Sequence, residues 1–191
     1  DEIHFANSTV WTLGTAPVHI HGTYRTEGVA SNPFAGDDFL YGYGGDDSLV
    51  GGAGNDFYVF NTNTLLGSDT VTDSAGNDYL YFTGSTNGVT VNLGLTTPQV
   101  VNANLTLTLA SATSIEHIYG GSGNDTLIGN TLNNTLNGYE GDDVLSGGDG
   151  NDTLNGGGGK NILIGGNGVD LLTGGSSEDL LLGARYSLEN S

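Results

Sequence analysis

A nine-residue unit recurs seven times without a gap between residues 120 and 182. The units read GGSGNDTLI, GNTLNNTLN, GYEGDDVLS, GGDGNDTLN, GGGGKNILI, GGNGVDLLT and GGSSEDLLL. They fit the pattern GGxGxDxUx, with Asp or Asn at the sixth position and an apolar residue at the eighth. The same frame appears in PFAGDDFLY, GYGGDDSLV and GGAGNDFYV over residues 33–59 and, after a slip of four residues, in TLLGSDTVT and DSAGNDYLY over 64–81. Such a repeat predicts a solenoid, in which each unit packs only on its neighbours.

The apolar eighth position predicts a short strand in every unit. Its neighbours at the seventh and ninth positions point the other way, because side chains alternate along a strand. Each unit is then a three-residue strand followed by a six-residue glycine turn, and two units make one coil of 18 residues. Strands two units apart stack at about 4.8 Å, which predicts an all-β fold of two parallel sheets around a thin leucine core.

The charge balance limits the partners of the chain. It carries 22 acidic and three basic residues, for a formal net charge of −19. It has no Lys or Arg patch to neutralise phosphates, so neither nucleic acid nor an anionic membrane surface is expected as a partner. No apolar run approaches the ~18 residues of a spanning helix, so no membrane insertion is expected. The absence of Cys rules out disulfides, and bound cations are then the obvious way to offset the acidic charge.

Stacked turns would also stack the carboxylates at the sixth position. Two unit charges ~4.8 Å apart repel by ~1 kcal/mol in water and by ~3.5 kcal/mol at an effective dielectric of ~20. A ladder of such pairs is comparable with the roughly 5–15 kcal/mol by which domains are stable. A bound Ca²⁺ turns this repulsion between carboxylates into attraction, because the ion takes about six to eight oxygen ligands and the turns offer carboxylates and main-chain carbonyls. Mg²⁺ demands a tighter octahedron, and zinc would lack its usual His and Cys ligands.

The predicted calcium ligands are the side chains of the sixth-position aspartates. They are Asp38, Asp47, Asp56, Asp69, Asp78, Asp125, Asp143, Asp152, Asp170 and Asp179. Full sites are expected between same-side turns, pairing Asp125 with Asp143, Asp152 with Asp170, Asp38 with Asp56 and, if the slip at 60–63 only bulges one turn, Asp47 with Asp69 and Asp56 with Asp78. Sites that include Asn134 or Asn161 should be weaker or empty. The alternative is that these Asn and Asp residues merely close the turns, but ten aspartates in one register favour calcium.

Residues 33–81 and 120–182 resemble the RTX, or haemolysin-type, calcium-binding repeats of proteins secreted by Gram-negative bacteria. The resemblance implies a right-handed parallel β-roll with Ca²⁺ ions in the turns. It also implies a chain that stays unfolded in the low-calcium cytosol, leaves by type I secretion and folds outside. The glycine positions would add carbonyl ligands, here Gly36, Gly45, Gly54, Gly121, Gly123, Gly141, Gly148, Gly150 and Gly168. The sequence departs from the family pattern at Leu132 and Ser177, which replace the fourth-position glycine, and at Asn134 and Asn161.

The rest of the chain divides around the two repeat arrays. We expect N-terminal capping strands over 1–32, the first array over 33–81, non-metal solenoid rungs with a protruding loop over 82–118, the second array over 119–182 and a C-terminal tail over 183–191. Alternation in GVTVNLGL and NLTLTLAS supports the rungs, and the loop around TTPQVVNAN should protrude. The absence of Met predicts a processed protein or a piece of a larger one.

One outer face of the first array is predicted to be aromatic. The outward residues are Phe39, Tyr41, Phe57, Val59, Tyr79 and Tyr81, and the same sheet should end apolar at Ile162, Ile164, Leu180 and Leu182. A solvated sheet seldom exposes such a block. Either the N-terminal strands or the 82–118 loop cover it, or it docks another domain or subunit.

Catalysis is not indicated by any motif. The sequence shows no serine-nucleophile motif, phosphate loop or metalloprotease helix. His19 and His21 share one face of a predicted strand, but surface histidines explain them better than a transition-metal site. The outward Thr residues raise the alternative of an ice-binding face, but the third-position residues are too mixed for a regular array.

The leading hypothesis is a non-catalytic, calcium-binding structural module of a secreted or cell-surface protein, which folds on Ca²⁺ outside the cell and serves surface assembly or adhesion. The alternative is the export and folding module of a secreted protease, lipase or polysaccharide epimerase whose catalytic domain lies elsewhere. The family occurs on toxins, enzymes, adhesins and surface-layer proteins, so the repeat does not choose between these roles.

Overall fold

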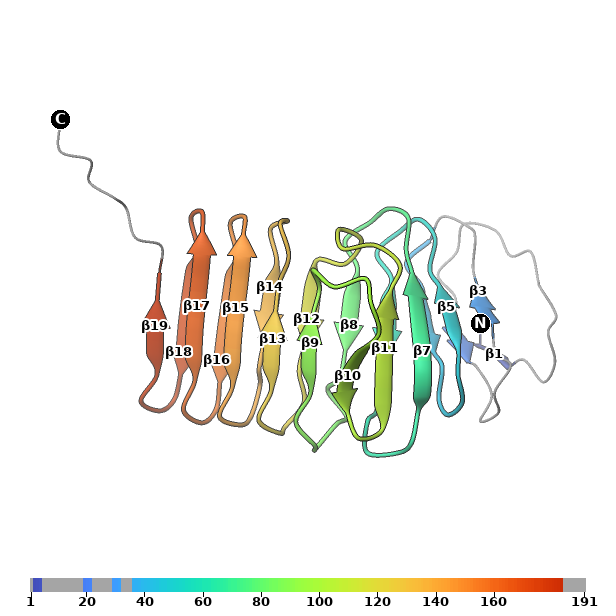
Figure 1. Ribbon diagram of the computed structural model, residues 1–191, viewed down its shortest axis with the longest axis horizontal. Coiled ribbons are helices and arrows are strands. Elements are labelled where there is room, and N and C mark those ends of the chain that lie inside the picture. The colour runs from blue at the N-terminus through green and yellow to red at the C-terminus, as the bar shows by residue number, and fades with distance from the viewer. Residues whose placement is uncertain (1, 5–18, 22–28, 32–35, 184–191) are drawn as a thin grey trace.

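The computed structural model is a flattened solenoid built from strands (Figure 1). It describes residues 2–4, 19–21, 29–31 and 36–183, and this part of the chain contains no helix. The described residues therefore include no helix that is long and apolar enough to cross a membrane.

Three sheets make up the two faces. The long sheet contains, in spatial order, β1 (Glu2–His4), β2 (His19–His21), β4 (Phe39–Tyr41), β6 (Phe57–Val59), β8 (Tyr79–Tyr81), β12 (His117–Tyr119), β14 (Thr135–Asn137), β16 (Thr153–Gly157) and β18 (Leu171–Gly175). The N-terminal short sheet contains β3 (Val29–Ser31), β5 (Ser48–Val50), β7 (Gly67–Thr72), β11 (Leu105–Leu109) and β10 (Gln99–Asn102). The C-terminal short sheet contains β9 (Thr90–Asn92), β13 (Thr126–Ile128), β15 (Val144–Asp149), β17 (Ile162–Asn167) and β19 (Leu180–Leu182).

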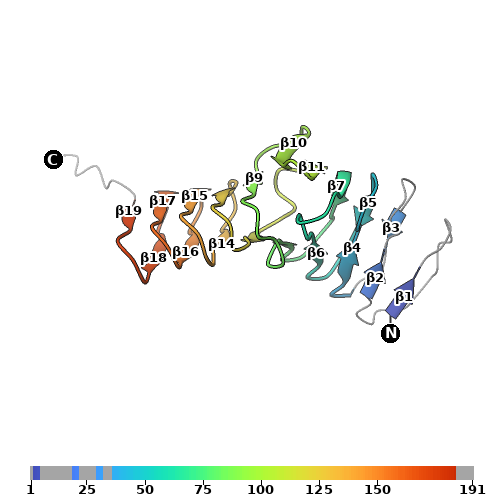
Figure 2. The ribbon, with the colours of Figure 1, turned by 90° about the horizontal axis from the view of Figure 1, so that it is seen from below.

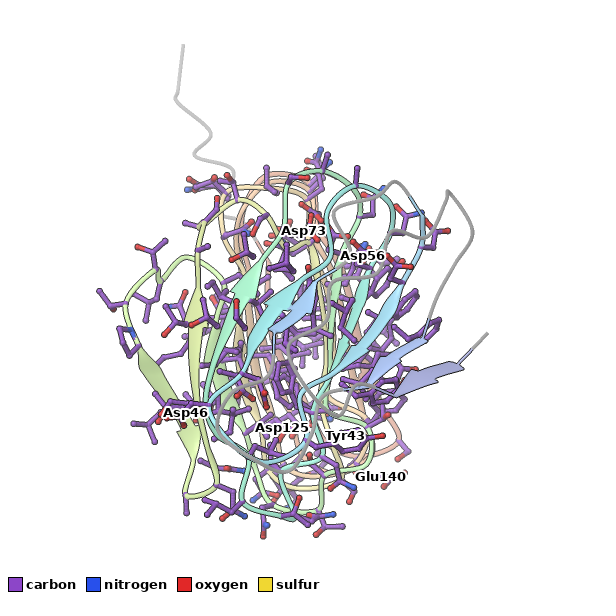
Figure 3. The ribbon with its side chains drawn as sticks, turned by 90° about the vertical axis from the view of Figure 1, so that its right-hand side faces the viewer. Tyr43, Asp46, Asp56, Asp73, Asp125 and Glu140 are labelled. Atoms are coloured by element: carbon purple, nitrogen blue, oxygen red, sulfur yellow. The ribbon has the colours of Figure 1, made fainter. Side chains whose placement is uncertain are left out.

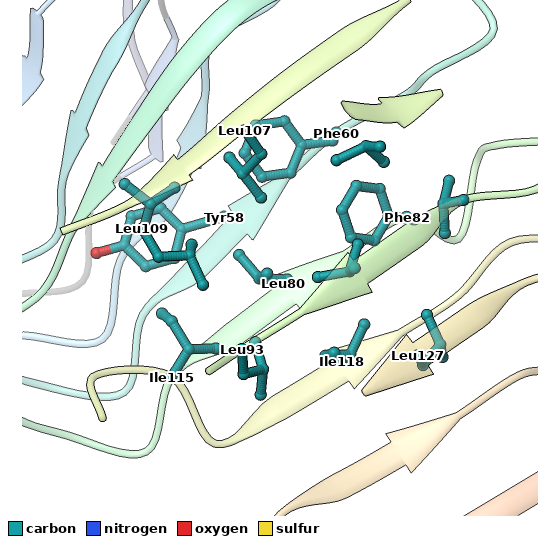
Figure 4. Close-up of a cluster of buried hydrophobic side chains, with 14 of the residues drawn as sticks. Tyr58, Phe60, Leu80, Phe82, Leu93, Leu107, Leu109, Ile115, Ile118 and Leu127 are labelled. Carbon is teal, nitrogen blue, oxygen red and sulfur yellow. The ribbon is translucent and has the colours of Figure 1, made fainter. Parts of the chain in front are cut away.

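The eighth position fills the core, as the repeat predicts. In β4, for example, Leu40 is fully buried while its two neighbours are half-buried. Strand pairing is parallel and in register, so Leu40 lies beside Tyr58 and Tyr58 beside Leu80. Figure 4 shows Tyr58 and Leu80 among the side chains of the middle coils that fill the space between the faces. The prediction of an all-β parallel β-roll is confirmed.

The long sheet runs unbroken through both repeat arrays. β8 of the first array pairs with β12, and β12 pairs with β14 of the second array. The segment SATSIEHIY, residues 111–119, is therefore a repeat unit whose sixth position is Glu116 and whose eighth is the buried Ile118. The two arrays form one solenoid rather than two.

This extra unit corrects one expectation about the faces. The prediction that Ile162, Ile164, Leu180 and Leu182 belong to the aromatic sheet is wrong, because β17 and β19 lie in the C-terminal short sheet. An uncounted strand exchanges the two faces for every unit that follows it.

The 82–118 segment contains a β-hairpin. β10 and β11 pair antiparallel, and β11 then pairs with β7 to extend the N-terminal short sheet. The hairpin stands away from the axis of the solenoid, where the two short sheets separate (Figure 2). Gln99 ties it to β9, because its side chain accepts a hydrogen bond from the Asn92 N–H (2.8 Å) and donates one to the Asn92 carbonyl (3.1 Å).

The predicted aromatic face is present on the long sheet. Rings stack from coil to coil, with centroid distances of 4.5 Å for Phe39–Phe57, 4.4 Å for Phe57–Tyr79 and 4.3 Å for Tyr79–His117. These side chains are half-buried. The β10–β11 hairpin does not cover them, since it extends the opposite face.

The ends of the solenoid are described only in part. At the N-terminal end β1 and β2 continue the long sheet in parallel register, with His19 beside Phe39 and His21 beside Tyr41. β3 continues the N-terminal short sheet at this end. The rest of the predicted cap and the tail from residue 184 lie outside the described residues, and the segment boundaries stay predictions. At the C-terminal end the β19 leucines are 43–52 % exposed.

Candidate metal sites in the turns

The sixth-position side chains bridge successive coils. In eight of them the Oδ1 atom accepts a hydrogen bond from the main-chain N–H of the sixth-position residue one coil earlier. The bonds are Asp38–Asp56 (2.8 Å), Asp47–Asp69 (3.0 Å), Asp56–Asp78 (2.8 Å), Asp125–Asp143 (2.8 Å), Asn134–Asp152 (2.8 Å), Asp143–Asn161 (2.9 Å), Asp152–Asp170 (3.0 Å) and Asn161–Asp179 (2.8 Å), donor first. This role needs only an acceptor oxygen, so Asn161 performs it as Asp does.

The second carboxylate oxygen is left without a hydrogen bond in five of these residues. The Oδ2 atoms of Asp56, Asp69, Asp143, Asp152 and Asp170 are buried and have no hydrogen-bond partner. A buried charge without a partner is costly, and such groups are normally paired or bound to a metal. The oxygens therefore fit a cation in the turn.

Main-chain carbonyls face the same space as the open oxygen. A Cβ added to Gly147 would lie within 2.5 Å of both Asp152 Oδ2 and the Gly165 carbonyl oxygen, so the two oxygens converge on one point. The first position of this unit, Gly147, therefore has no room for a side chain. Carboxylate and carbonyl oxygens are the donors that Ca²⁺ prefers.

Asn161 shows what happens when the sixth position carries no charge. Its Nδ2 donates to the carbonyl oxygens of Gly159 (3.4 Å) and Gly174 (3.3 Å). The amide hydrogens thus satisfy the carbonyls that an aspartate at this position could reach only through a cation. A turn with Asn161 can be complete without an ion.

Burial changes the acidity of the open carboxylates. It raises the pKa of Asp69 to about 7, and the hydrogen bond from the Asp47 amide only partly opposes this. Burial likewise raises the pKa of Asp143 and of Asp152 to about 6. In each case nearby carboxylates, Asp125 for Asp143 and Asp170 for Asp152, add to the effect. Without a cation, the ionised form of these aspartates is therefore disfavoured.

Asp125 differs from the other sixth-position aspartates. Both of its oxygens are hydrogen-bonded, Oδ1 to the Val89 N–H and Oδ2 to the Gly121 N–H, each at 2.8 Å. The amide of Asn130 donates to Asn134 Oδ1 in the same way (2.8 Å). The expected full site between Asp125 and Asp143 therefore has one open carboxylate rather than two.

The remaining predicted ligands also lie in the turns. Asp38, Asp47 and Asp78 are buried, whereas Asp179 is half-buried in the last coil. Eight of the nine predicted carbonyl donors lie in turns, and Gly148 lies within β15; the residues in turns are Gly36, Gly45, Gly54, Gly121, Gly123, Gly141, Gly150 and Gly168. Their part in binding an ion stays a prediction.

Two acidic residues that the repeat pattern did not indicate join the ladder. Glu116 takes the sixth position in β12's unit, and its Oε2 accepts the Asp78 N–H (2.9 Å). Asp73 occupies a first position, where most units carry glycine, and lies with Asp56 and Asp78 in a group whose ligand oxygens are all within 4.8 Å of one another. Burial, aided by the charge of Asp73, raises the pKa of Asp56 and of Asp78. Glu116 was detectable only by allowing Glu for Asp.

Comparison with known families identifies the repeat. A model described as the RTX calcium-binding nonapeptide repeat (4 copies) matches residues 35–58, 64–84, 119–154, 128–163 and 155–185. The chain belongs to the RTX calcium-binding repeat family. All the sixth-position aspartates fall within the matched segments, which supports Ca²⁺ as the ion for the open oxygens. No curated protein matches the sequence.

Proposed function

We propose that this chain is a calcium-dependent structural module of a secreted or cell-surface bacterial protein, and that it folds when Ca²⁺ binds outside the cell. The observation that carries the proposal is the set of buried Oδ2 atoms without a partner, in turns that offer carbonyl oxygens beside them. A bound Ca²⁺ would supply the positive charge that these turns lack. Because the unfolded chain holds no preformed site, the binding free energy is also folding free energy.

The ligand set suits an environment rich in calcium. Five turns offer an open carboxylate oxygen beside neutral carbonyls, and calcium affinity falls as the number of charged ligands falls. Extracellular calcium modules work at roughly 10⁻⁴–10⁻³ M, far above cytosolic levels. A calcium affinity in this range would favour folding outside the cell, as the secretion of proteins with this family's repeats also does.

The role proposed is structural rather than catalytic. The buried carboxylates are committed to the hydrogen bonds between coils, and this favours a scaffold. Assembly as part of that role is favoured because Leu171 and the leucines of β19 are exposed on the last described strands of two sheets. Exposed apolar strands at an edge are ready to pair with further strands.

A calcium titration tests the proposal. Far-UV circular dichroism should change from coil to β-structure as Ca²⁺ rises from chelator into the millimolar range, and Mg²⁺ should not replace it. A β spectrum that chelator leaves unchanged would refute calcium-dependent folding. Sedimentation of the calcium-bound chain at rising concentration tests assembly separately.

A further inference from the structure

We propose that Asp73, which lies outside the repeat's own ligand pattern, joins the sixth-position Asp56 and Asp78 in one cation site, and that this site binds the first and tightest divalent ion of the chain. In four other turns one carboxylate oxygen is open, at Asp69, Asp143, Asp152 and Asp170. This turn brings three carboxylates together, because an aspartate has replaced the first-position glycine. The inference needs only the folded solenoid and does not depend on secretion or assembly.

The three carboxylates converge on one small space. One oxygen from each lies within 4.8 Å of the others, and all three side chains are at least nine-tenths buried. Asp56 Oδ2 is fully buried and has no hydrogen-bond partner. A Cβ added to Gly51 would lie within 2.6 Å of Asp56 Oδ2, Asp73 Oδ2 and the Tyr58 hydroxyl, so these oxygens surround a common point. Figure 3 shows Asp56 and Asp73 together at one end of the coil, opposite Asp125.

Asp73 is held in place by donors on both oxygens. Its Oδ1 accepts the Ala75 N–H (3.1 Å), and its Oδ2 accepts the Tyr58 hydroxyl (2.6 Å). The Tyr58 oxygen in turn accepts the Gly51 N–H (2.9 Å). Tyr58 occupies the eighth position, which is usually leucine, so its ring crosses the core to deliver a hydroxyl to the turn.

The need of the Tyr58 hydroxyl for a hydrogen-bond acceptor does not by itself explain why residue 73 is an aspartate. The hydroxyl already has the Thr72 carbonyl oxygen at 3.1 Å as an acceptor, and a neutral asparagine would serve equally well. A third negative charge beside Asp56 and Asp78 adds repulsion that a bound cation would remove without protonating the carboxylates. Glu116 increases the negative potential, since its carboxylate is bonded to the Asp78 N–H.

The donor set indicates a hard divalent or trivalent cation. Carboxylate oxygens suit Ca²⁺, and the number of charged ligands is what raises calcium affinity above that of weaker sites. With three carboxylates the site should therefore fill before the single-carboxylate turns.

Terbium luminescence can address this site directly. Tb³⁺ replaces Ca²⁺ at oxygen sites and emits when a nearby tyrosine transfers its excitation. The Tyr58 hydroxyl lies within hydrogen-bond distance of a proposed ligand, so Tb³⁺ added to the folded chain should give tyrosine-sensitised emission at the first equivalent. Tyr58→Phe should remove most of that first-equivalent emission while Tb³⁺ still binds, as measured by calorimetry.

Two charge-matched variants decide whether Asp73 is a ligand. Asp73→Asn is isosteric and should weaken the first Tb³⁺ and the first Ca²⁺ roughly tenfold to a hundredfold, because it removes one of three charged ligands. Asp149→Asn removes the same charge at an exposed position and should leave that affinity unchanged. Circular dichroism confirms folding, and Asp73→Gly, which restores the usual first-position residue, serves if Asp73→Asn does not fold.

Three outcomes would overturn the proposal. They are an unchanged first equivalent in a folded Asp73 variant, an equal loss in Asp149→Asn, and first-equivalent emission that Tyr58→Phe does not lower. A chain that stays folded in chelator yet shows the Tyr58-dependent first site would refute calcium-dependent folding and leave this site standing.

Discussion

Replacing Asp143 by asparagine should have opposite effects without and with calcium. Asp143 Oδ1 accepts the Asp125 N–H, and the carboxamide oxygen would keep that bond. The new Nδ2 would take the place of the open Oδ2. By analogy with Asn161, it would donate to the main-chain carbonyls of its turn. The variant turn should therefore be complete without an ion and unable to bind one well.

The magnitude follows from the acidity of Asp143. Burial raises its pKa from 3.8 to about 6, and each unit corresponds to ~1.4 kcal/mol. At pH 8 the ionised carboxylate thus costs the calcium-free fold ~3 kcal/mol, which asparagine would return. One calcium site contributes ~2.7 kcal/mol when the ion is at ~100 times its dissociation constant. The two chains should be equally stable near that concentration, with the variant more stable below it.

The control is the same substitution one coil earlier. Both oxygens of Asp125 accept hydrogen bonds from main-chain N–H groups. The side-chain NH₂ group of an asparagine at this position would therefore face one of these N–H groups, and two donors cannot form a hydrogen bond. Asp125→Asn should lose roughly 1–3 kcal/mol with or without calcium. Urea unfolding of both variants at pH 8, across a calcium series, measures the difference. Destabilisation of Asp143→Asn in chelator would refute the proposed use of the second oxygen.

Three further predictions concern pH, the turns and the core. In chelator the raised pKa values of Asp69, Asp143 and Asp152 stabilise the protonated fold, so the free energy of unfolding should fall as pH rises from about 4 to 7. In excess calcium the free energy of unfolding should not fall over this range, because protons compete with the ion. Urea unfolding at each pH, with chelator and with calcium, tests both expectations. Gly168→Ala should cost more than ~2 kcal/mol, since its Cβ would overlap the Gly150 carbonyl oxygen at a φ of 127°; Gly183→Ala, which meets nothing within 4 Å, is the control, and equal melting temperatures would contradict the close approach. Leu145→Ala should cost ~2–5 kcal/mol and Leu181→Ala clearly less, because Leu145 is fully buried while Leu181 is 43 % exposed; thermal melts in saturating calcium compare them.

The fold could be predicted from the sequence because two repeating features agree: the position of the apolar residue in each unit and the length of the coil. The apolar eighth position fixes which side chain faces the core, and the 18-residue coil fixes which strands pair. The structure keeps that pairing, for example between Leu136 and Leu154. What failed was the count of strands, because Glu116 hid one unit. A parallel roll alternates its faces, so one missed strand misplaced β17 and β19 while leaving their register intact.

The site was predictable in its residues but not in its chemistry. An aspartate at the sixth position looks the same in the sequence of every unit. In the structure, Asp125 and Asp143 differ in whether a hydrogen-bond donor contacts the second carboxylate oxygen. The Gly121 N–H reaches it at Asp125, whereas Asp143 has no donor there. The residue of the Asp143 unit that corresponds to Gly121 is Tyr139, which has a φ of 71° and donates its N–H to Asn137 Oδ1 instead. Asp73 was missed because it replaces a glycine rather than extending the pattern.

The sixth position therefore performs two separable tasks. One oxygen receives the amide of the preceding coil and holds the stack together, and asparagine does this as well as aspartate, as Asn161 shows. The second atom decides whether the turn needs an ion: an amide nitrogen binds the carbonyls directly, an open carboxylate oxygen requires a cation. The calcium demand of the solenoid is then set by the number of open oxygens rather than by the number of aspartates. Exchanging Asp for Asn coil by coil would change the ion dependence of folding and leave the coil-to-coil hydrogen bonds in place.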